Sequence, residues 1–231
     1  QADAAPEAQK KPDSEQSGEP SGELHASTNG TATDTQGELP VGNEPDYAKY
    51  MPAITDATLT IEDGALDASH AILVDLTTGE ALAQRLADER IYPASMTKVL
   101  TLLTAAEKID DPQAEFTITQ GLIDPHYKRG ATITGYRAGD VCTLNDLFYG
   151  AALRSSADAT SALAIAAGGT EEQFIQMMND KCAQLQLSSN AHFTNTSGLF
   201  AGDHTCSLLD MAAIMRAAMN NELCAKVMST D

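Results

Sequence analysis

The pattern of hydrophobic and polar residues predicts a hairpin followed by helices, after a long polar stretch. Residues 71–75 are a short apolar run typical of a buried strand, and residues 80–86 follow a Thr-Thr-Gly turn as its hairpin partner. A helix that is apolar almost all round is predicted over 95–109, and such a helix must be buried. Residues 116–119 alternate like a further strand, and 121–140 are predicted to be a long connection.

Helical periodicity dominates the second half of the chain. We predict a helix after Thr143 as its N-cap, one over 158–167, and one after Thr170, where Thr-x-x-Gln is a capping box. A last helix follows Ser207, with Met211 and Met215 on its inner face. A hairpin followed by helices favours an α+β fold, in which a helical part packs on an antiparallel sheet.

Residues 1–50 contain few large apolar side chains and are predicted to be a disordered acidic tail or linker. The ordered domain is therefore expected over 53–231. The net charge of −19 argues against a nucleic-acid partner, because such a partner requires a basic surface. The sequence contains no run of about 18 apolar residues, so no membrane span is predicted. We expect any export signal to have been removed from this sequence.

The four cysteines, Cys142, Cys182, Cys206 and Cys224, are widely spaced. They match no zinc-binding pattern, so no metal site is predicted. Disulfides and buried free thiols both remain open, and no pairing follows from the spacing.

Ser95 and Lys98 lie three residues apart at the start of the predicted apolar helix. This spacing puts the serine hydroxyl and the lysine amine side by side on one helix face. Serine needs a base to become a nucleophile at neutral pH, and lysine can be that base when burial lowers its pKa. Ser-x-x-Lys also arises by chance at helix starts, so the neighbouring motifs decide its meaning.

Four segments, in order along the chain, resemble the D-alanyl-D-alanine carboxypeptidases, which are low-molecular-mass penicillin-binding proteins. The resemblance covers about 53–230 and implies the penicillin-binding-protein/β-lactamase-like transpeptidase fold. The similar segments are the hairpin at 71–80, Tyr-Pro-Ala-Ser-Met-Thr-Lys at 92–98, Leu-Phe-Tyr-Gly at 147–150 with Ser-Ser-Ala-Asp-Ala at 155–159, and Phe-Thr-Asn-Thr-Ser-Gly-Leu at 193–199 followed by Asp203, His204 and Asp210.

The resemblance implies a role for each matching residue. Ser95 is the nucleophile that attacks the bond between the two D-alanines of a peptidoglycan stem peptide, and Lys98 is the general base. Ser155 relays a proton to the leaving amine, while Ser156 and Ala157 occupy substrate-binding positions. The backbone N–H of Ser95 supplies half of the oxyanion hole. Neither a metal nor a cofactor is needed.

Ala157 departs from the family pattern, because it stands where the family has asparagine. Alanine has no amide to orient the substrate or Lys98. A shifted alignment, with the motif at 156–158, would place the carboxylate of Asp158 there instead. We prefer the first alignment because Asp158 and Ala159 then match the family's following Asp-Ala pair.

A second departure is larger: the family's third motif, Lys-Thr-Gly on a strand beside the nucleophile, does not occur in this sequence. Two main strands are also too few for a stable sheet. We therefore expect a C-terminally truncated fragment of a longer protein, with the missing strands beyond Asp231. On its own this polypeptide is expected to have little or no carboxypeptidase activity.

Three other functions are weighed against this one. A serine β-lactamase of the closest class needs a glutamate on a loop, whereas Glu171 and Glu172 lie in a helix cap. An inactive wall-binding domain is favoured by Ala157 and by the missing third motif. A Ser-His hydrolase is not predicted, because His192 and His204 lack an acidic partner at an informative spacing. We expect His204 to hold a loop near the site.

The resemblance also implies the partners and the compartment. The expected ligands are peptidoglycan stem peptides, with β-lactam antibiotics as covalent inhibitors. The expected location is extracytoplasmic in a bacterium, secreted or associated with the cell envelope. Association with the membrane or wall would require segments outside this chain.

Overall fold

The computed structural model describes residues 46–230, and the predicted tail up to residue 45 lies outside this range. Residues 47–50, at the end of the predicted tail, form a short 3₁₀ helix instead, η1 (Tyr47–Tyr50), which packs against α6 (Leu208–Met219). Arg216 of α6 holds this turn by donating hydrogen bonds to the carbonyls of Tyr50 and Met51. The domain therefore begins a few residues earlier than expected.

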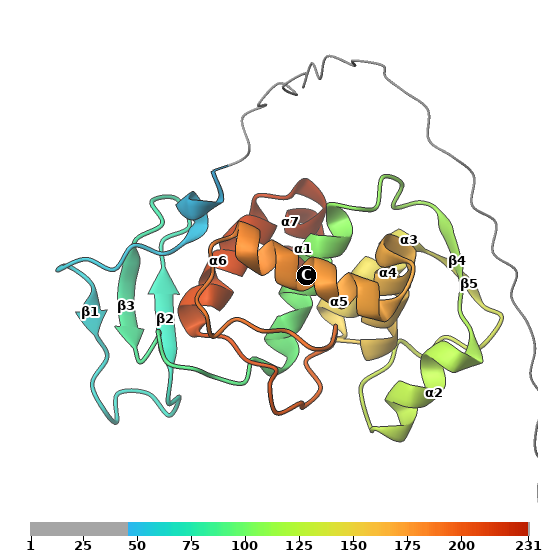
Figure 1. Cartoon of the computed structure of the whole chain (residues 1–231), viewed down its shortest axis with the longest axis horizontal. Coiled ribbons are helices and arrows are strands. Elements are labelled where there is room, and N and C mark those ends of the chain that lie inside the picture. Colours follow the sequence, from blue (N-terminus) through green and yellow to red (C-terminus); the bar gives the residue numbers. More distant parts are fainter. Residues whose placement is uncertain (1–45, 231) are drawn as a thin grey trace, which may run out of the picture. The chain divides into compact units, whose positions relative to one another are not determined.

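The predicted hairpin is confirmed and forms two of the three strands of the larger sheet. Strand β2 (Ala71–Val74) pairs antiparallel with β3 (Ala81–Arg85). A two-residue strand that the pattern did not predict, β1 (Leu59–Thr60), pairs parallel with β3, so the strand order is β1-β3-β2. Figure 1 shows this sheet beside the helical part, with β2 nearest to α6. Strand β2 is thus an edge strand in the described part of the chain.

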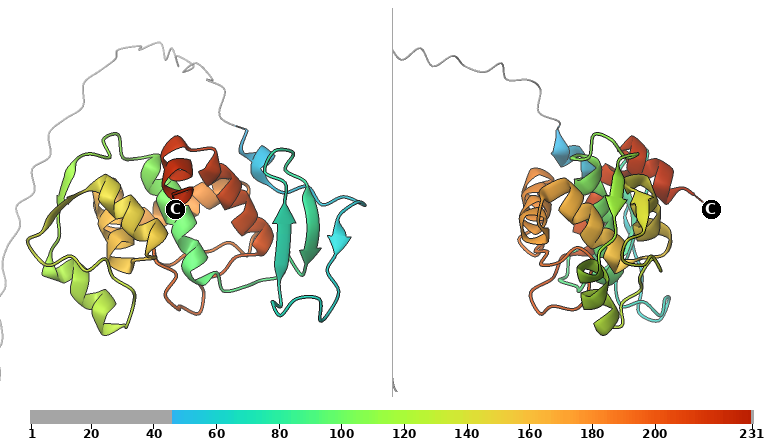
Figure 2. Two further views of the ribbon diagram at one scale, coloured as in Figure 1. Left: turned by 180° about the vertical axis from the view of Figure 1, so that it is seen from behind. Right: turned by 90° about the vertical axis from the view of Figure 1, so that its right-hand side faces the viewer.

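Helix α1 (Thr97–Ala106) forms the centre of the helical part, as its apolar composition predicts. It follows a 3₁₀ turn, η2 (Ala94–Met96), and packs against five other helices. Figures 1 and 2 show α1 between them. These neighbours are α3 (Leu144–Leu153), α4 (Ala157–Gly168), α5 (Glu171–Gln184), α6 and α7 (Glu222–Met228). Leu100, Leu102 and Leu103 are at most 2% exposed, and each such burial contributes about 1.5–3 kcal/mol.

The connection predicted over 121–140 is wrong in its first half, which is helix α2 (Gln120–Lys128). The hydroxyl of Thr119 caps this helix by accepting from the N–H of Leu122. Leu122 and Ile123 are buried, although Pro125 lies inside the helix. An apolar face this short gives little periodic signal, whereas Gly121 and Pro125 suggest a loop. A second small sheet, β4 (Glu115–Thr117) with β5 (Val141–Thr143), flanks α2 in sequence.

The helix caps follow the sequence closely. Thr143 and Ser207 form complete capping boxes with Asp146 and Asp210. Thr170 accepts from the N–H of Gln173, which is one half of the predicted box. The pattern missed α7 altogether.

Two further expectations have an outcome in the fold. Met211 is buried as expected, but Met215 is 37% exposed and borders the cavity that contains Ser95. The four cysteines are unpaired and buried, and burial raises the pKa of Cys182, Cys206 and Cys224 to about 12. No helix within residues 46–230 is long and apolar enough to cross a membrane.

Candidate active site

The structure brings Ser95 and Lys98 together at the start of α1. Ser95 lies in the η2 turn and is exposed, whereas Lys98 is only 6% exposed. The amine of Lys98 donates to the hydroxyl of Ser95 at 3.2 Å. An accessible hydroxyl above a buried amine is the arrangement that a serine nucleophile and its base require.

Burial lowers the pKa of Lys98 from its ordinary value of 10.5 to about 8. The cause is desolvation, because the charged ammonium loses water that the protein replaces only in part. A substantial fraction of the amine is therefore neutral in mildly alkaline solution, and a neutral amine can accept the Ser95 proton.

The segment 193–199 holds Lys98 from the other side. The amine of Lys98 donates to the carbonyl of Ser197 at 2.6 Å. The side-chain oxygen of Asn195 accepts from the N–H groups of Ser197 and Gly198, at 3.2 and 2.7 Å. This local turn gives the Ser197 carbonyl a fixed direction. No sequence pattern predicts the contact between Lys98 and Ser197, because the acceptor is a backbone carbonyl.

Gly198 allows this segment to pack against the η2 turn, which contains Ser95. It has a φ of +77°, and a Cβ atom there would lie 1.8 Å from the carbonyl oxygen of Ala94. The hydroxyl of Tyr92 also donates to the Gly198 carbonyl. Ala94 itself has a φ of +48°, which is unusual for a residue other than glycine. The turn that presents Ser95 is thus constrained from both sides.

His204 joins the same segment to α1. It is fully buried, its Nδ1 accepts from the N–H of Thr194 at 3.0 Å, and its Nε2 lies 2.7 Å from the hydroxyl of Thr97. Since Nδ1 accepts, the hydrogen of the neutral ring is on Nε2 and is donated to Thr97. Burial lowers the pKa of His204 to about 4, so the ring is neutral near pH 7. The loop-holding role expected for His204 agrees with these contacts.

Ser155 shares a cavity of about 230 Å³ with Ser95 and Lys98. It lies in the turn between α3 and α4 with a φ of +55°. This strained conformation costs about 1–3 kcal/mol and is often found at functional sites. The relay role of Ser155 stays a prediction that its location supports.

Ser156 and Ala157 lie deeper than Ser155 and do not line this cavity. They are 0% and 2% exposed, and the N–H of Ala157 donates to the Thr132 carbonyl. The hydroxyl of Ser156 is buried without a partner in the described region. Their substrate-binding roles stay predictions, because a ligand would have to reach buried side chains.

The carboxylate of Asp158 is hydrogen-bonded to Thr134, which argues against the shifted alignment of the second motif. Its carboxylate accepts from the N–H of Thr134 at 2.9 and 3.1 Å and from the Thr134 hydroxyl at 2.5 Å. Asp158 is 1% exposed. It therefore anchors the segment before β5 rather than facing the Ser95 cavity.

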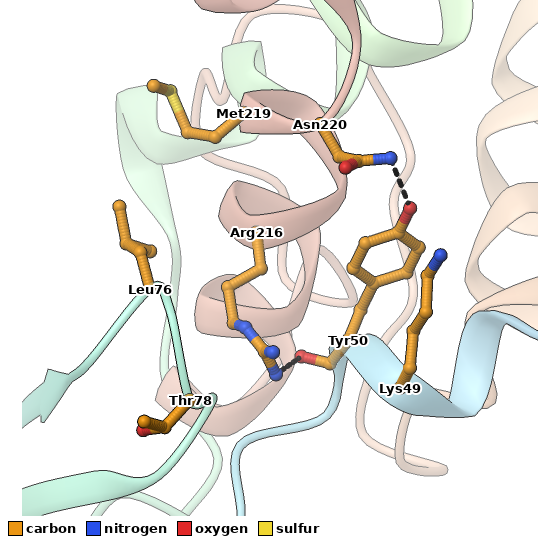
Figure 3. A pocket seen from close by; sticks show the side chains of 7 residues that line it. All are labelled: Lys49, Tyr50, Leu76, Thr78, Arg216, Met219 and Asn220. Atoms are coloured by element: carbon orange, nitrogen blue, oxygen red, sulfur yellow. Dashed lines mark hydrogen bonds between the residues drawn. The ribbon is translucent and has the colours of Figure 1, made fainter.

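A larger cavity, of about 570 Å³, is separate from this site (Figure 3). Arg216 donates to the carbonyl of Tyr50 at 2.8 Å, and Asn220 donates to the Tyr50 hydroxyl at 2.9 Å. These contacts fasten η1 to the end of α6. The lining of this larger cavity contains neither Ser95 nor Lys98. It consists of Lys49, Tyr50, Leu76, Thr78, Arg216, Met219 and Asn220.

The side chains at Ser95 contain no evident metal site. Within the described range, no group of three or more His, Cys, Asp or Glu residues is arranged to hold a metal ion. The chemistry that this arrangement offers is acyl transfer by a serine and a lysine.

Comparison with known proteins agrees with this geometry. The sequence profile of the D-alanyl-D-alanine carboxypeptidase family matches residues 56–230. The chain is 31% identical over 166 residues to the D-alanyl-D-alanine carboxypeptidase DacF of Bacillus subtilis, covering 72% of this chain and 42% of DacF. It is 30% identical over 178 residues to DacC of Escherichia coli, covering 74% of this chain and 44% of DacC. The chain thus spans less than half the length of these relatives.

Solved structures show the same fold. The Streptomyces K15 DD-transpeptidase superposes with a TM-score of 0.70 at 27% identity, over 74% of this chain and 68% of that structure. Penicillin-binding protein 6B of Escherichia coli superposes with a TM-score of 0.62 at 30% identity, over 68% and 52%. The described part therefore has the penicillin-binding-protein fold expected from the sequence, and the chain belongs to the D-alanyl-D-alanine carboxypeptidase family.

Proposed function

We propose that this chain carries the acyl-enzyme-forming part of a serine-type D-Ala-D-Ala carboxypeptidase that trims peptidoglycan stem peptides. The observation that carries the proposal is the exposed Ser95 hydroxyl 3.2 Å from the buried Lys98 amine. The family membership supplies the substrate class.

In the proposed reaction, the neutral amine of Lys98 accepts the Ser95 proton as the hydroxyl attacks the carbonyl between the two D-alanines. The backbone N–H of Ser95 stabilises the developing oxyanion. Ser155 relays a proton to the amine of the departing D-alanine, which leaves an acyl group on Ser95. Water then hydrolyses this ester and regenerates the hydroxyl.

The second half of the site is proposed to come from further strands of the family domain. The edge of β2 is unpaired in the described region, and an apolar groove of about 370 Å³ lies beside it. The groove is lined by side chains of β2, α1 and α6, among them Val74, Val99 and Met211. A strand with Lys-Thr-Gly would supply the substrate-carboxylate contact, so these 231 residues alone are expected to have little activity.

The proposed partners and compartment follow from the same family. We expect peptidoglycan stem peptides as substrates, β-lactams as acylating inhibitors and an extracytoplasmic location in the bacterial cell envelope. The names of the relatives, which are D-alanyl-D-alanine carboxypeptidases of bacteria, support the substrate class, and the similarity to penicillin-binding protein 6B supports the inhibitors.

The test is release of D-alanine from a peptide ending in D-Ala-D-Ala by the full-length gene product. Wild type should release D-alanine, and Ser95→Ala should not. A chromogenic cephalosporin in parallel separates the β-lactamase alternative, because a carboxypeptidase stays acylated and turns it over slowly. A folded wild-type protein that releases no D-alanine and forms no penicillin adduct would instead be an inactive wall-binding domain.

A further inference from the structure

Glu171, the first residue of α5, makes contacts that a helix cap does not require. A negative charge at this position is ordinarily explained by the helix dipole. Here the carboxylate also accepts from two buried hydroxyls. Thr196 donates to Oε1 at 2.9 Å, and Ser161 of α4 donates to Oε2 at 3.0 Å. Glu171 therefore links α5 to α4 and to the segment that contacts Lys98.

The acceptors in this cluster indicate how its hydrogens are arranged. The Thr196 hydroxyl also lies 3.2 Å from the Thr160 hydroxyl, but a carboxylate only accepts and is the stronger acceptor, so the hydroxyl hydrogens of Ser161 and Thr196 both point to Glu171. The Ser161 oxygen must then accept from Nε2 of His126, which lies 2.9 Å away. That fixes the neutral tautomer of His126, whose Nδ1 is buried without a partner among the described residues. Burial also lowers the pKa of His126, which agrees with a neutral ring.

Thr196 carries the effect of Glu171 to the reaction centre. Thr196 is fully buried, and its carbonyl accepts from the hydroxyl of Thr101 in α1 at 2.7 Å. It is thus held through its side chain by α5 and through its backbone by α1. The next residue, Ser197, offers the carbonyl that accepts from Lys98 at 2.6 Å. A shift of Thr196 would move that carbonyl.

We propose that Glu171 is a positioning residue for Lys98. It holds Thr196 in place, so that the Ser197 carbonyl takes one amine hydrogen and the lone pair of the neutral amine is left to face Ser95. The proposal rests on the proposed function of Ser95 and Lys98. A small displacement of the Lys98 amine should slow the reaction strongly, since a misplacement of about 1 Å can lower a rate about 100-fold.

Glu171 could instead be a base that activates water for deacylation, as the loop glutamate of some β-lactamases is. Both oxygens of its carboxylate already accept hydroxyl hydrogens within the cluster, which favours the positioning role. The two roles affect different steps: positioning of Lys98 governs acylation, whereas water activation governs deacylation.

The experiment compares four variants of the full-length gene product: Glu171→Ala, Glu171→Gln, Glu172→Ala and Glu172→Gln. Glu172 is the matched control, because it is in the same helix turn, is exposed and makes none of these hydrogen bonds. The measured quantities are the rate of acylation by a fluorescent penicillin and the rate at which the acyl-enzyme then loses its label.

For Glu171→Ala we expect acylation to fall about 10- to 100-fold with deacylation unchanged. Glu171→Gln should stay within about threefold of wild type, because an amide can accept from one hydroxyl and donate to the other. Both Glu172 variants should match wild type. Wild-type acylation in Glu171→Ala overturns the proposal. So does a selective loss of deacylation in both Glu171 variants, which would identify a water-activating base.

Two additions keep the test decisive. Thr196→Val removes the hydroxyl while keeping the side-chain shape, and it should lose acylation as Glu171→Ala does. Wild-type acylation by a folded Thr196→Val protein overturns the proposal even if Glu171→Ala fails to fold. Hydrogen exchange of the amides at 194–198 should be faster in Glu171→Ala than in Glu172→Ala. This holds whether or not penicillin acylates the wild type, so failure of the proposed function is distinguished from failure of this inference.

Discussion

The carbonyl of Ser197 accepts a hydrogen bond from the amine of Lys98 at 2.6 Å, across 99 residues of the chain. The same amine lies 3.2 Å from the hydroxyl of Ser95. Lys98 therefore joins the η2 turn, which contains Ser95, to the segment 193–199. Gly198 against Ala94 and His204 against Thr97 reinforce this junction.

Acylation of Ser95 should depend on pH through Lys98. In the proposed reaction the neutral amine of Lys98 is the reacting form, and its fraction rises as the pH passes the pKa of about 8. The acylation rate of the full-length gene product should therefore rise about tenfold per pH unit below pH 7 and level off above pH 8 to 9. Fluorescent-penicillin labelling from pH 6 to 9.5 measures this. A rate that is already constant below pH 7 would show that Lys98 is not the titrating base.

Lys98→Met should stabilise the protein at neutral pH while abolishing acylation. The buried amine is mostly charged at pH 7, and the lowering of its pKa from 10.5 to about 8 corresponds to roughly 3 kcal/mol of unfavourable burial. Loss of the bond to Ser197 offsets part of this, so we expect a gain of about 1–2 kcal/mol.

The pH dependence provides the control for this variant. The folded protein binds fewer protons at Lys98 than the unfolded chain between pH 8 and 10.5, so wild-type stability should rise over that window. The advantage of Lys98→Met should accordingly shrink from pH 7 to pH 10 in urea unfolding. An equal difference at both values would contradict the account.

His204 should make the folded state sensitive to acid. Its pKa is about 4 in the folded protein and 6.5 ordinarily. The unfolded chain therefore binds the extra proton first, and stability is lost as the pH falls from 6.5 to 4, by up to roughly 3 kcal/mol. His204→Gln, which cannot titrate, should be less stable than wild type at pH 7 and nearly equal to it at pH 4. Urea midpoints at the two pH values measure this, and a constant gap would refute the role of the ring.

Gly198→Ala should destabilise the site far more than a glycine substitution in open space. The new Cβ would lie 1.8 Å from the Ala94 carbonyl oxygen, so the turn before Ser95 must move, at a cost of about 3 kcal/mol or more. Gly130→Ala is the control, because Gly130 also has a positive φ, of +66°, with nothing within 4 Å. It should cost about 1 kcal/mol. Equal losses of stability and acylation in both variants would show that the close approach is unimportant.

The parts of this site that depend on local spacing could be predicted from sequence. Ser95 and Lys98 are one helical turn apart, and the caps at Thr143 and Ser207 act over three residues. Helix α2 was missed because Gly121 and Pro125 suggest a loop while only a short face is buried. In each case the sequence signal lay within a few residues, whether the prediction from it was correct or wrong.

The long-range contacts had no such signal. The Ser197 acceptor is a backbone carbonyl, which any residue type would provide. Glu171 was correctly placed in a helix cap, yet its hydroxyl partners come from α4 and from Thr196, 25 residues away. Met215 follows the helix period but faces the cavity of Ser95. The apolar periodicity of a helix does not show which part of its apolar face other elements bury.

The most direct test of the central claim is mass spectrometry of the full-length gene product after incubation with benzylpenicillin. We predict one added penicillin per protein molecule, located on the peptide that contains Ser95, and no adduct in Ser95→Ala or Lys98→Met. A folded wild-type protein without an adduct, or with the adduct on another residue, would contradict the assignment of Ser95 and Lys98 as nucleophile and base.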